Sequence, residues 1–273
     1  MKKSDILVLG AGFIGKRIQR ELKCVICLKK IRGFDDVEAI ISNYKPKIII
    51  NCIGYVGKNV DQCELNKNKA IFANTYVPIL LAEAAFRHQI RLIHISSGCI
   101  FKYDYKKNLP LIETRRPDFL GLFYSRTKIF SEAALEGLLP KADILILRIR
   151  VPLDSRPHPK NILDKLIKYK KIIDIPNSIT YIPDFIKALK HLVNYKAKGV
   201  YNIVNDGALR YPDLMDIYKK HKPDYRYKKI SLKQLGLVRT NLLLSTKKLK
   251  KTGFKVRNIN HILEECVKEY MRF

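Results

Sequence analysis

A tyrosine and a lysine stand four residues apart in the sequence, as Tyr124 and Lys128. The spacing of apolar residues in Phe123–Leu138 predicts a helix, and residues four apart on a helix share one face. A phenol with a pKa of about 10 is a poor acid–base group at neutral pH, and a nearby ammonium favours the phenolate. The pair can donate a proton to a carbonyl oxygen as a hydride arrives. The spacing alone is common in a chain rich in Lys and Tyr.

A pair of serines, Ser96 and Ser97, lies at the end of a strand predicted over Arg91–Ser96. Doubly wound sheets bind their ligands at the carboxyl ends of the strands. Ser97, Tyr124 and Lys128 therefore form a candidate catalytic set.

The segment GAGFIG at residues 10–15 follows a predicted strand, Asp5–Leu9, and opens a predicted helix, Phe13–Leu22. Its glycines permit a tight turn, close approach of the backbone to a pyrophosphate, and close packing of helix on strand. The helix N-terminus then faces the phosphates. The segment predicts dinucleotide binding; the alternative is an ordinary glycine-rich turn.

The residues after the second predicted strand, Cys24–Leu28, decide between the two nicotinamide cofactors. An acidic residue there would bind a ribose 2′-hydroxyl, but Lys29, Lys30 and Arg32 stand there instead. Basic side chains suit a 2′-phosphate, so the sequence favours NADP(H), with Lys30 as a candidate contact. The alternative is background lysine.

Apolar strands alternate with helices through the first half of the chain, which predicts an α/β fold with a doubly wound parallel sheet. After residue 150 the pattern becomes less regular. We expect a cofactor-binding domain at 1–150 and a smaller, mainly substrate-binding part at 151–273, interleaved with the sheet domain. Further strands are predicted at Lys47–Cys52, Asp143–Ile149, Lys171–Ile175 and Gly199–Val204. Further helices are predicted at Val37–Tyr44, Asn68–His88 with a break at Pro78, Asn161–Tyr169, Asp184–Asn194, Pro212–His221 and His261–Met271.

The chain has 273 residues and a formal net charge of +28. Its lysines are spread along the whole sequence without a nucleic-acid-binding motif, so we expect compositional bias rather than a specific nucleic-acid partner. Cys24 and Cys27 form a CxxC, but within a strand they point to opposite faces, which argues against a metal or redox site. The absence of an 18-residue apolar stretch predicts no membrane span, and we expect a cytoplasmic setting.

Taken together, the chain resembles extended short-chain dehydrogenases/reductases that act on nucleotide sugars. It is similar to dTDP-4-dehydrorhamnose reductases and GDP-fucose synthases, and especially to the nucleotide-rhamnose epimerase/reductases that form UDP-L-rhamnose. The resemblance covers almost the whole chain and rests on the segments NCIGYVGKNVDQCE (51–64), ISSGCIFKYD (95–104), FLGLFYSRTK (119–128), LRIRVPL (147–153), PKNILDKLIKYKKIIDIPNSIT (159–180) and RTNLLLSTKKL (239–249).

The resemblance implies a role for each candidate residue. Ser97 and Tyr124 would hold and protonate the C4 carbonyl oxygen, and Lys128 would bind the nicotinamide ribose. The residues lining the cofactor would be Gly10, Gly12, Phe13, Ile14, Gly15, Cys52, Ile53 and Gly54, and those on the nucleotide-sugar side would be Asn161, Arg239 and Asn241. Segment 239–249 departs from the family in its leucines and in Ser245, which stands where relatives usually have Asp.

Cys99 separates the candidate activities, because the epimerising relatives have a cysteine two residues after the catalytic Ser or Thr. Inverting a carbon next to a ketone needs a base on one face and an acid on the other. The resemblance assigns these roles to Cys99 and Lys165; the alternatives are a small buried hydrophobe and a solvated helix lysine.

The expected activity is NADPH-dependent 3,5-epimerisation and 4-reduction of UDP-4-keto-6-deoxy-D-glucose, giving UDP-L-rhamnose. The alternatives are a plain dTDP-4-dehydrorhamnose reductase, a GDP-fucose synthase-like reductase, and a non-catalytic NADP-binding regulatory subunit. The preferred nucleotide stays open. The superfamily favours a homodimer.

Overall fold

The structure, a computed structural model, describes residues 3–273. The chain divides into two compact units whose segments interleave. The first unit contains the chain up to Ile100, Pro117–Arg148 and Lys196–Tyr201; the second contains Phe101–Arg116, Ile149–Tyr195 and Asn202–Phe273. The assignment of cofactor binding to one part and substrate binding to the other stays a prediction.

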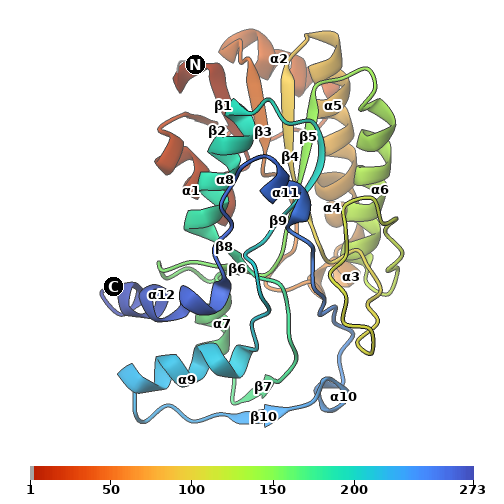
Figure 1. The fold of residues 1–273 in the computed structure, drawn as a ribbon. Helices are drawn as coiled ribbons and strands as arrows, with labels where there is room; N and C mark the ends of the chain where they lie inside the picture. Colours follow the sequence, from red (N-terminus) through yellow and green to blue (C-terminus); the bar gives the residue numbers. More distant parts are fainter. Residues whose placement is uncertain (1–2) are drawn as a thin grey trace. The chain divides into compact units, whose positions relative to one another are not determined.

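The first unit is built on a central parallel sheet of six strands in the order β2-β1-β3-β4-β5-β9 (Figure 1). Its strands are β1 (Ile6–Leu9), β2 (Val25–Cys27), β3 (Ile48–Asn51), β4 (Arg91–Ser97), β5 (Ile144–Ile149) and β9 (Gly199–Ile203). Every residue of β1, β3 and β4 is buried. This agrees with the continuous apolar runs in the sequence, which are typical of strands covered on both faces. The chain reverses its direction across the sheet between β1 and β3, where folds of this order bind ligands.

Helices pack against this sheet. The helical segments are η1 (Lys3–Asp5), α1 (Phe13–Leu22), α2 (Phe34–Tyr44), α3 (Gln62–Leu65), α4 (Lys67–Ile71), η2 (Phe72–Tyr76), α5 (Val77–Arg87) and α6 (Phe123–Leu138). Helix α1 packs on β1 and β2, while α2, α5 and α6 lie side by side (Figure 1). The predicted helix 68–88 exists, but a π-helical turn, η2, divides it before Pro78, whose missing N–H removes one helical hydrogen bond.

The second unit contains α7 (Ile162–Ile167), α8 (Ile182–Asn194), α9 (Tyr211–His221), α10 (Leu232–Leu235), α11 (Lys247–Lys251), η3 (Ile259–His261) and α12 (Leu263–Tyr270). Two small parallel sheets accompany them: β6 (Pro152–Leu153) with β8 (Thr180–Tyr181), and β7 (Lys171–Ile173) with β10 (Lys228–Ile230). The sequence pattern missed β6, β8 and β10, because strands of two or three residues show no periodicity.

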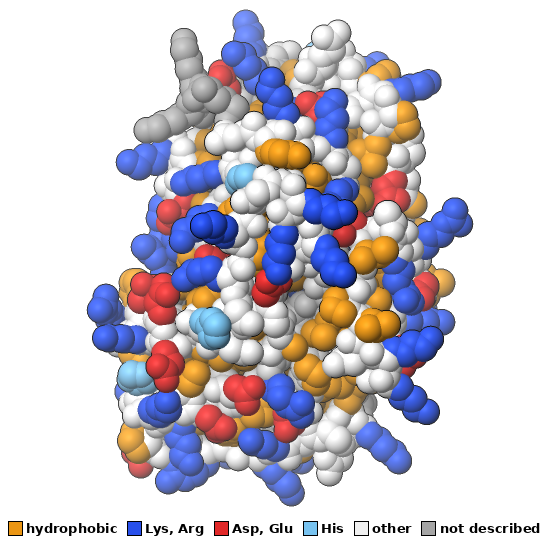
Figure 2. All heavy atoms as spheres, viewed as in Figure 1, with side chains coloured by type: hydrophobic (Ala, Val, Ile, Leu, Met, Phe, Trp, Pro, Cys, Tyr) orange, Lys and Arg blue, Asp and Glu red, His pale blue; other side chains and the backbone are white. Residues whose placement is uncertain are grey.

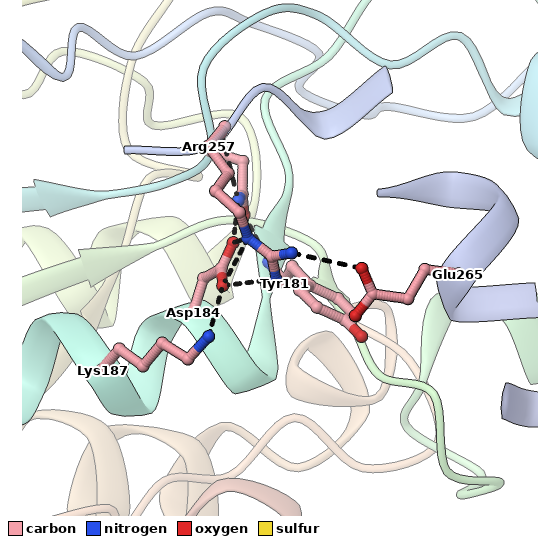
Figure 3. A network of polar contacts seen from close by, with 6 residues as sticks. Tyr181, Asp184, Lys187, Arg257 and Glu265 are labelled. Atoms are coloured by element: carbon pink, nitrogen blue, oxygen red, sulfur yellow. Dashed lines mark hydrogen bonds and ion pairs between the residues drawn. The ribbon is translucent and has the colours of Figure 1, made fainter. Parts of the chain in front are cut away.

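An ion-pair network joins α8 to the C-terminal segment within the second unit (Figure 3). Both carboxylate oxygens of Asp184 accept from the Arg257 guanidinium at 2.7–3.1 Å, and Asp184 also accepts from the Asn205 amide at 2.7 Å. Arg257 reaches Glu265 on α12 at 3.2 Å and lies over the Tyr181 ring. Because Asp184 is buried, its charge depends on these partners.

The side chains on the surface carry charges of both signs. Figure 2 shows Lys and Arg side chains spread over the whole viewed face with acidic side chains between them. Among residues 3–273, no helix is both long and apolar enough to cross a bilayer.

We predict that Asp184→Asn lowers the free energy of unfolding by about 1–3 kcal/mol, since it weakens a buried, charge-assisted set of hydrogen bonds. Lys187→Gln is the matched control: Lys187 is an exposed partner of the same carboxylate, 4.0 Å away, and its loss should change stability by less than about 0.5 kcal/mol. Urea unfolding of both variants measures the difference; equal losses would contradict this account.

Candidate active site

The glycine turn after β1 packs directly on the loop after β3. Gly10 has φ +97°, and a Cβ there would lie 2.6 Å from the backbone nitrogen of Ile53. A Cβ on Gly15 would lie 1.9 Å from the Gly10 carbonyl oxygen, whereas one on Gly12 would have no atom within 4 Å. Gly10 and Gly15 thus allow the turn to pack tightly, Gly10 against the loop after β3 and Gly15 against the Gly10 carbonyl, whereas Gly12 leaves open space beside the turn. This division of roles suits a pyrophosphate approaching the backbone at Gly12.

Helix α1 begins directly after this turn, with Gly12 as its N-cap residue. Gly12 provides no side-chain cap and the first turn, with Phe13 and Ile14, has no acidic residue. The positive end of the helix dipole therefore meets no acidic side chain from the helix's own first turn, which favours an anion at this position. These residues fit a dinucleotide phosphate.

The basic residues after β2 do not all stand free. Arg32 donates to Asp36 at 2.9–3.2 Å, and the Lys29 ammonium lies 3.3 Å from the same carboxylate. Arg32 thereby holds the pKa of Asp36 well below its usual range. Lys30 is exposed. All three bases lie at the sheet edge expected for a 2′-phosphate, with Asp36 as an internal counter-charge.

Ser97 and Cys99 lie at the end of β4 and in the turn after it. Ser97 is nearly buried, and its Oγ accepts from the Cys99 N–H at 3.1 Å, which leaves the hydroxyl proton available to donate. The Cys99 thiol is partly exposed, and its backbone carbonyl accepts from the Ser125 hydroxyl on α6. The start of α6 therefore holds the 97–99 turn.

Tyr124 and Lys128 share one face of α6. Glu64 caps the helix by accepting from the Phe123 N–H at 2.7 Å, which fixes the turn that carries Tyr124. Tyr124 is partly buried, while Lys128 is only 4% exposed and donates to the Ile95 carbonyl at 3.4 Å. The predicted pair thus combines a partly buried tyrosine with a buried lysine one helical turn later.

The Lys128 ammonium lies beside the loop after β3. A Cβ on Gly54 would be 3.9 Å from Lys128 Nζ. Burial lowers the pKa of Lys128 to about 8, against the attraction of Glu132. Burial also raises the pKa of Cys52. The glycine turn, the 52–54 loop and Lys128 therefore come together within the first unit.

Three buried polar residues that the sequence analysis did not single out hold this loop. Asn51 accepts from the Ile53 N–H at 2.9 Å, so its amide nitrogen faces His94 Nδ1 at 3.1 Å. Burial lowers the pKa of His94 well below its usual range, so the neutral ring carries its proton on Nε2. Asn74 binds the backbone of Tyr55 through both amide atoms, at 2.7 and 2.9 Å. A polar residue, asparagine or histidine, within an apolar strand or helix is the signal that could have found all three.

The remaining predicted residues lie in the second unit. Asn161 is buried and caps α7, and both atoms of its amide bind backbone groups of residues 154–163. Asn241 is buried, with its oxygen accepting from Asn177 at 3.1 Å. Their contact with a sugar nucleotide stays a prediction; in this structure the Asn161 amide supports a loop, while Asn241 Nδ2 is buried without a hydrogen-bond partner among residues 3–273.

Lys165 and Arg239 are partly exposed, unlike the two asparagines. Burial, followed by the nearby charges of Lys160 and Arg239, lowers the pKa of Lys165. The mutual repulsion of these cations shows that they share one locality, which would attract an anionic ligand. Among the described residues, no His, Cys, Asp and Glu side chains gather into a candidate metal site.

The sheet, the open glycine turn and the polar groups at its carboxyl edge define a Rossmann-like α/β protein. Residues 5–272 match the RmlD substrate binding domain, and the chain belongs to that family.

Two curated relatives come from Arabidopsis thaliana. The bifunctional dTDP-4-dehydrorhamnose 3,5-epimerase/dTDP-4-dehydrorhamnose reductase is 29% identical over 251 residues, covering 88% of this chain and 82% of that protein. The trifunctional UDP-glucose 4,6-dehydratase/UDP-4-keto-6-deoxy-D-glucose 3,5-epimerase/UDP-4-keto-L-rhamnose-reductase RHM1 is 31% identical over 223 residues. That match covers 77% of this chain but 33% of RHM1, so the chain spans about a third of that relative's length.

Solved structures share the fold. The L780 UDP-rhamnose synthase of Acanthamoeba polyphaga mimivirus superposes with a TM-score of 0.87 at 25% identity, covering 97% of this chain and 99% of that one. The Bacillus anthracis dTDP-4-dehydrorhamnose reductase, in complex with NADP, gives a TM-score of 0.84 at 20% identity, with 97% and 98% coverage.

We predict that Lys128→Met stabilises the folded protein at pH 7 by about 1–3 kcal/mol, because it removes a buried ammonium whose pKa is lowered. In the wild type the unfolded chain binds the proton more tightly, so stability rises with pH between about 8, the native pKa, and about 10.4. The variant's advantage should shrink over that range. Urea unfolding at pH 7, 8.5 and 9.5 measures it; a less stable variant at pH 7 would contradict the assignment.

Proposed function

We propose that the protein is an NADPH-dependent nucleotide-sugar reductase with 3,5-epimerase activity, which converts UDP-4-keto-6-deoxy-D-glucose into UDP-L-rhamnose. The observation that carries the reductase part is the buried Lys128 ammonium beside Gly54, with Tyr124 on the same face of α6. Family membership supports the substrate class.

The residues of the first unit fit the dinucleotide. The Gly10–Gly15 turn and the α1 N-terminus would hold the phosphates of the dinucleotide, and Lys30 would bind its 2′-phosphate. The loop residues Cys52, Ile53 and Gly54 would line the cofactor. When bound, NADPH supplies the hydride that reduces C4 of the sugar and leaves as NADP⁺. The reported complex of the B. anthracis relative with NADP supports this choice of cofactor.

The polar groups act on the C4 oxygen. Ser97 donates a hydrogen bond to it, since its Oγ already accepts from Cys99 N–H. Tyr124 donates a hydrogen bond and then its proton, so that the ketone oxygen becomes a hydroxyl. Lys128 holds the nicotinamide ribose, and its positive charge stabilises the phenolate that remains.

Epimerisation precedes reduction, because the C4 ketone makes the protons on C3 and C5 acidic. The enolate places its charge on an oxygen that Ser97 and Tyr124 stabilise. We assign the proton exchange to the partly exposed Cys99 thiol and to Lys165, whose lowered pKa brings a basic amine closer to neutral pH. The names of both Arabidopsis relatives include 3,5-epimerisation, which supports this step.

Two other functions compete with this proposal. A plain reductase of a dTDP- or GDP-linked ketosugar would use Ser97, Tyr124 and Lys128 without Cys99 and Lys165. A non-catalytic NADP-binding subunit would need none of the five residues.

Incubation with UDP-, dTDP- and GDP-4-keto-6-deoxyhexoses and NADPH in D₂O separates these possibilities. We expect UDP-L-rhamnose carrying deuterium at C3 and C5, identified by NMR and mass spectrometry. A product without deuterium would contradict the proposed epimerase activity. The absence of turnover with every ketosugar would favour the non-catalytic NADP-binding subunit.

Two variants test the residue roles. Tyr124→Phe should lower kcat for reduction by about 10²–10⁴-fold, because the proton donor is lost, while deuterium exchange persists at a lower rate. Cys99→Ala should abolish exchange at one carbon or both. As the control, it should still reduce UDP-4-keto-L-rhamnose, which is already epimerised. Full rhamnose formation from the D-glucose-derived ketone by Cys99→Ala would defeat the role of the thiol.

A further inference from the structure

A buried carboxylate lies behind the proposed catalytic residues. Glu132 on α6 is 1% exposed, and Arg148 at the end of β5 is fully buried. One Glu132 oxygen accepts a hydrogen bond from Arg148 Nε at 2.8 Å, and the same oxygen forms an ion pair with Arg148 Nη2 at 2.7 Å. The other accepts from the hydroxyl of Ser96. A single side chain therefore joins α6, β4 and β5 within the first unit.

The direction of the Ser96 hydrogen bond is fixed by chemistry. An ionised carboxylate can only accept, so the Ser96 hydroxyl must donate to Glu132. Ser96 is the residue directly before Ser97, the proposed holder of the C4 oxygen. The bond therefore fixes the last residues of β4 against α6, the helix that carries Tyr124 and Lys128.

Glu132 also stands one helical turn after Lys128, on the same face of α6. Its negative charge raises the pKa of Lys128 and partly offsets the effect of burial. The other titratable groups that act on this ammonium are Cys52 and Cys63, which also raise its pKa, and His94, which is neutral. Of these groups, Glu132 raises the pKa of Lys128 the most.

A second carboxylate of α6 provides an internal comparison. Glu136 lies 3.5 Å from the same Arg148 guanidinium, but its side chain is 40% exposed. It stands two turns beyond Lys128 and is not among the charges that shift the lysine's pKa. Burial and the charge of Glu132 raise the pKa of Glu136. Of the two acids that share one arginine, only Glu132 is linked to the proposed catalytic residues.

We propose that Glu132 is a positioning residue for the reduction: through Ser96 it fixes the strand end that presents Ser97, and its charge keeps Lys128 protonated in its buried position. This inference rests on the proposed reductase function. Arg148 supplies the counter-charge that allows the carboxylate to stay ionised away from water.

The first test reads the lysine directly and needs no substrate. The ¹³Cε signal of Lys128, assigned by its loss in Lys128→Met, is titrated by NMR in protein labelled with ¹³C-lysine. Glu132→Gln should lower the pKa of Lys128 by about 1 unit or more, since a nearby opposite charge is lost. Glu136→Gln should change it by less than about 0.3 unit, since this carboxylate is farther away and better solvated. An unchanged pKa in Glu132→Gln, or equal shifts in both variants, would overturn the proposal.

Glu132→Gln leaves Arg148 without its main counter-charge, so this variant can fail to fold. The double variant Glu132→Gln/Arg148→Met removes both charges together and should fold, as shown by circular dichroism and cooperative melting. It should show the same downward shift of the Lys128 pKa. A Lys128 pKa equal to that of the wild type in the folded double variant would overturn the role of the Glu132 charge.

The second test concerns catalysis. In the wild type the reduction rate should fall at alkaline pH as Lys128 loses its proton. In Glu132→Gln, the alkaline limb of the pH–rate profile should move to lower pH by the same amount as the pKa measured by NMR. In Glu132→Asp, which keeps the negative charge, the shift should be smaller. A purely structural role would lower kcat at every pH without moving the limb. If no ketosugar is reduced, the proposed function fails, while the NMR titration still decides whether Glu132 controls the charge of Lys128.

Discussion

The polar groups at the carboxyl edge of the sheet surround one buried ammonium group, that of Lys128. Lys128 is surrounded by the end of β4, the loop after β3 and its own helix, and burial alone would favour its neutral form. A charged amine persists in such a place only when other groups oppose that cost. The carboxylate of Glu132 and the carbonyl of Ile95 do so, and each comes from an element whose position matters for the site. Glu132 is thus one buried polar side chain of this core whose charge opposes the cost of burying Lys128.

A second constraint is the direct packing of the glycine turn on the loop after β3. The gap between Gly10 and Ile53 is too small for a methyl group, and the same holds for Gly15 against the Gly10 carbonyl. Gly12 is different, since its surroundings are open. The three glycines of one motif therefore serve two purposes: two allow packing of the protein on itself, and one leaves space for a ligand. This distinction needs coordinates, because the sequence shows three identical residues.

The main elements could be predicted because their hydrophobic patterns are long. Helices α1 and α6 have the predicted ends, and the five strands predicted before residue 150 are present within a residue or two of their predicted bounds. Three kinds of feature escaped, the first of which is the short helices α3, α10 and α11. Strands β6, β8 and β10 are too short to show a pattern. The support of the site by Asn51, Asn74 and Glu132 depends on pairing between distant segments, and a single polar letter does not reveal its partner. Resemblance named the reactive residues, whereas the surrounding network emerged only from the coordinates.

The interleaving of the two units has a consequence for how such a protein changes over time. The chain passes from one unit to the other after residues 100, 116, 148, 195 and 201. Neither unit is therefore a contiguous stretch of sequence. A single crossover between two genes cannot replace one unit and leave the other unit intact. A change confined to one unit therefore has to arise by substitutions and loop changes inside an unbroken reading frame. For the same reason, a nascent chain leaving the ribosome completes its sheet only after β9 has been synthesised, when nearly three quarters of the sequence has emerged.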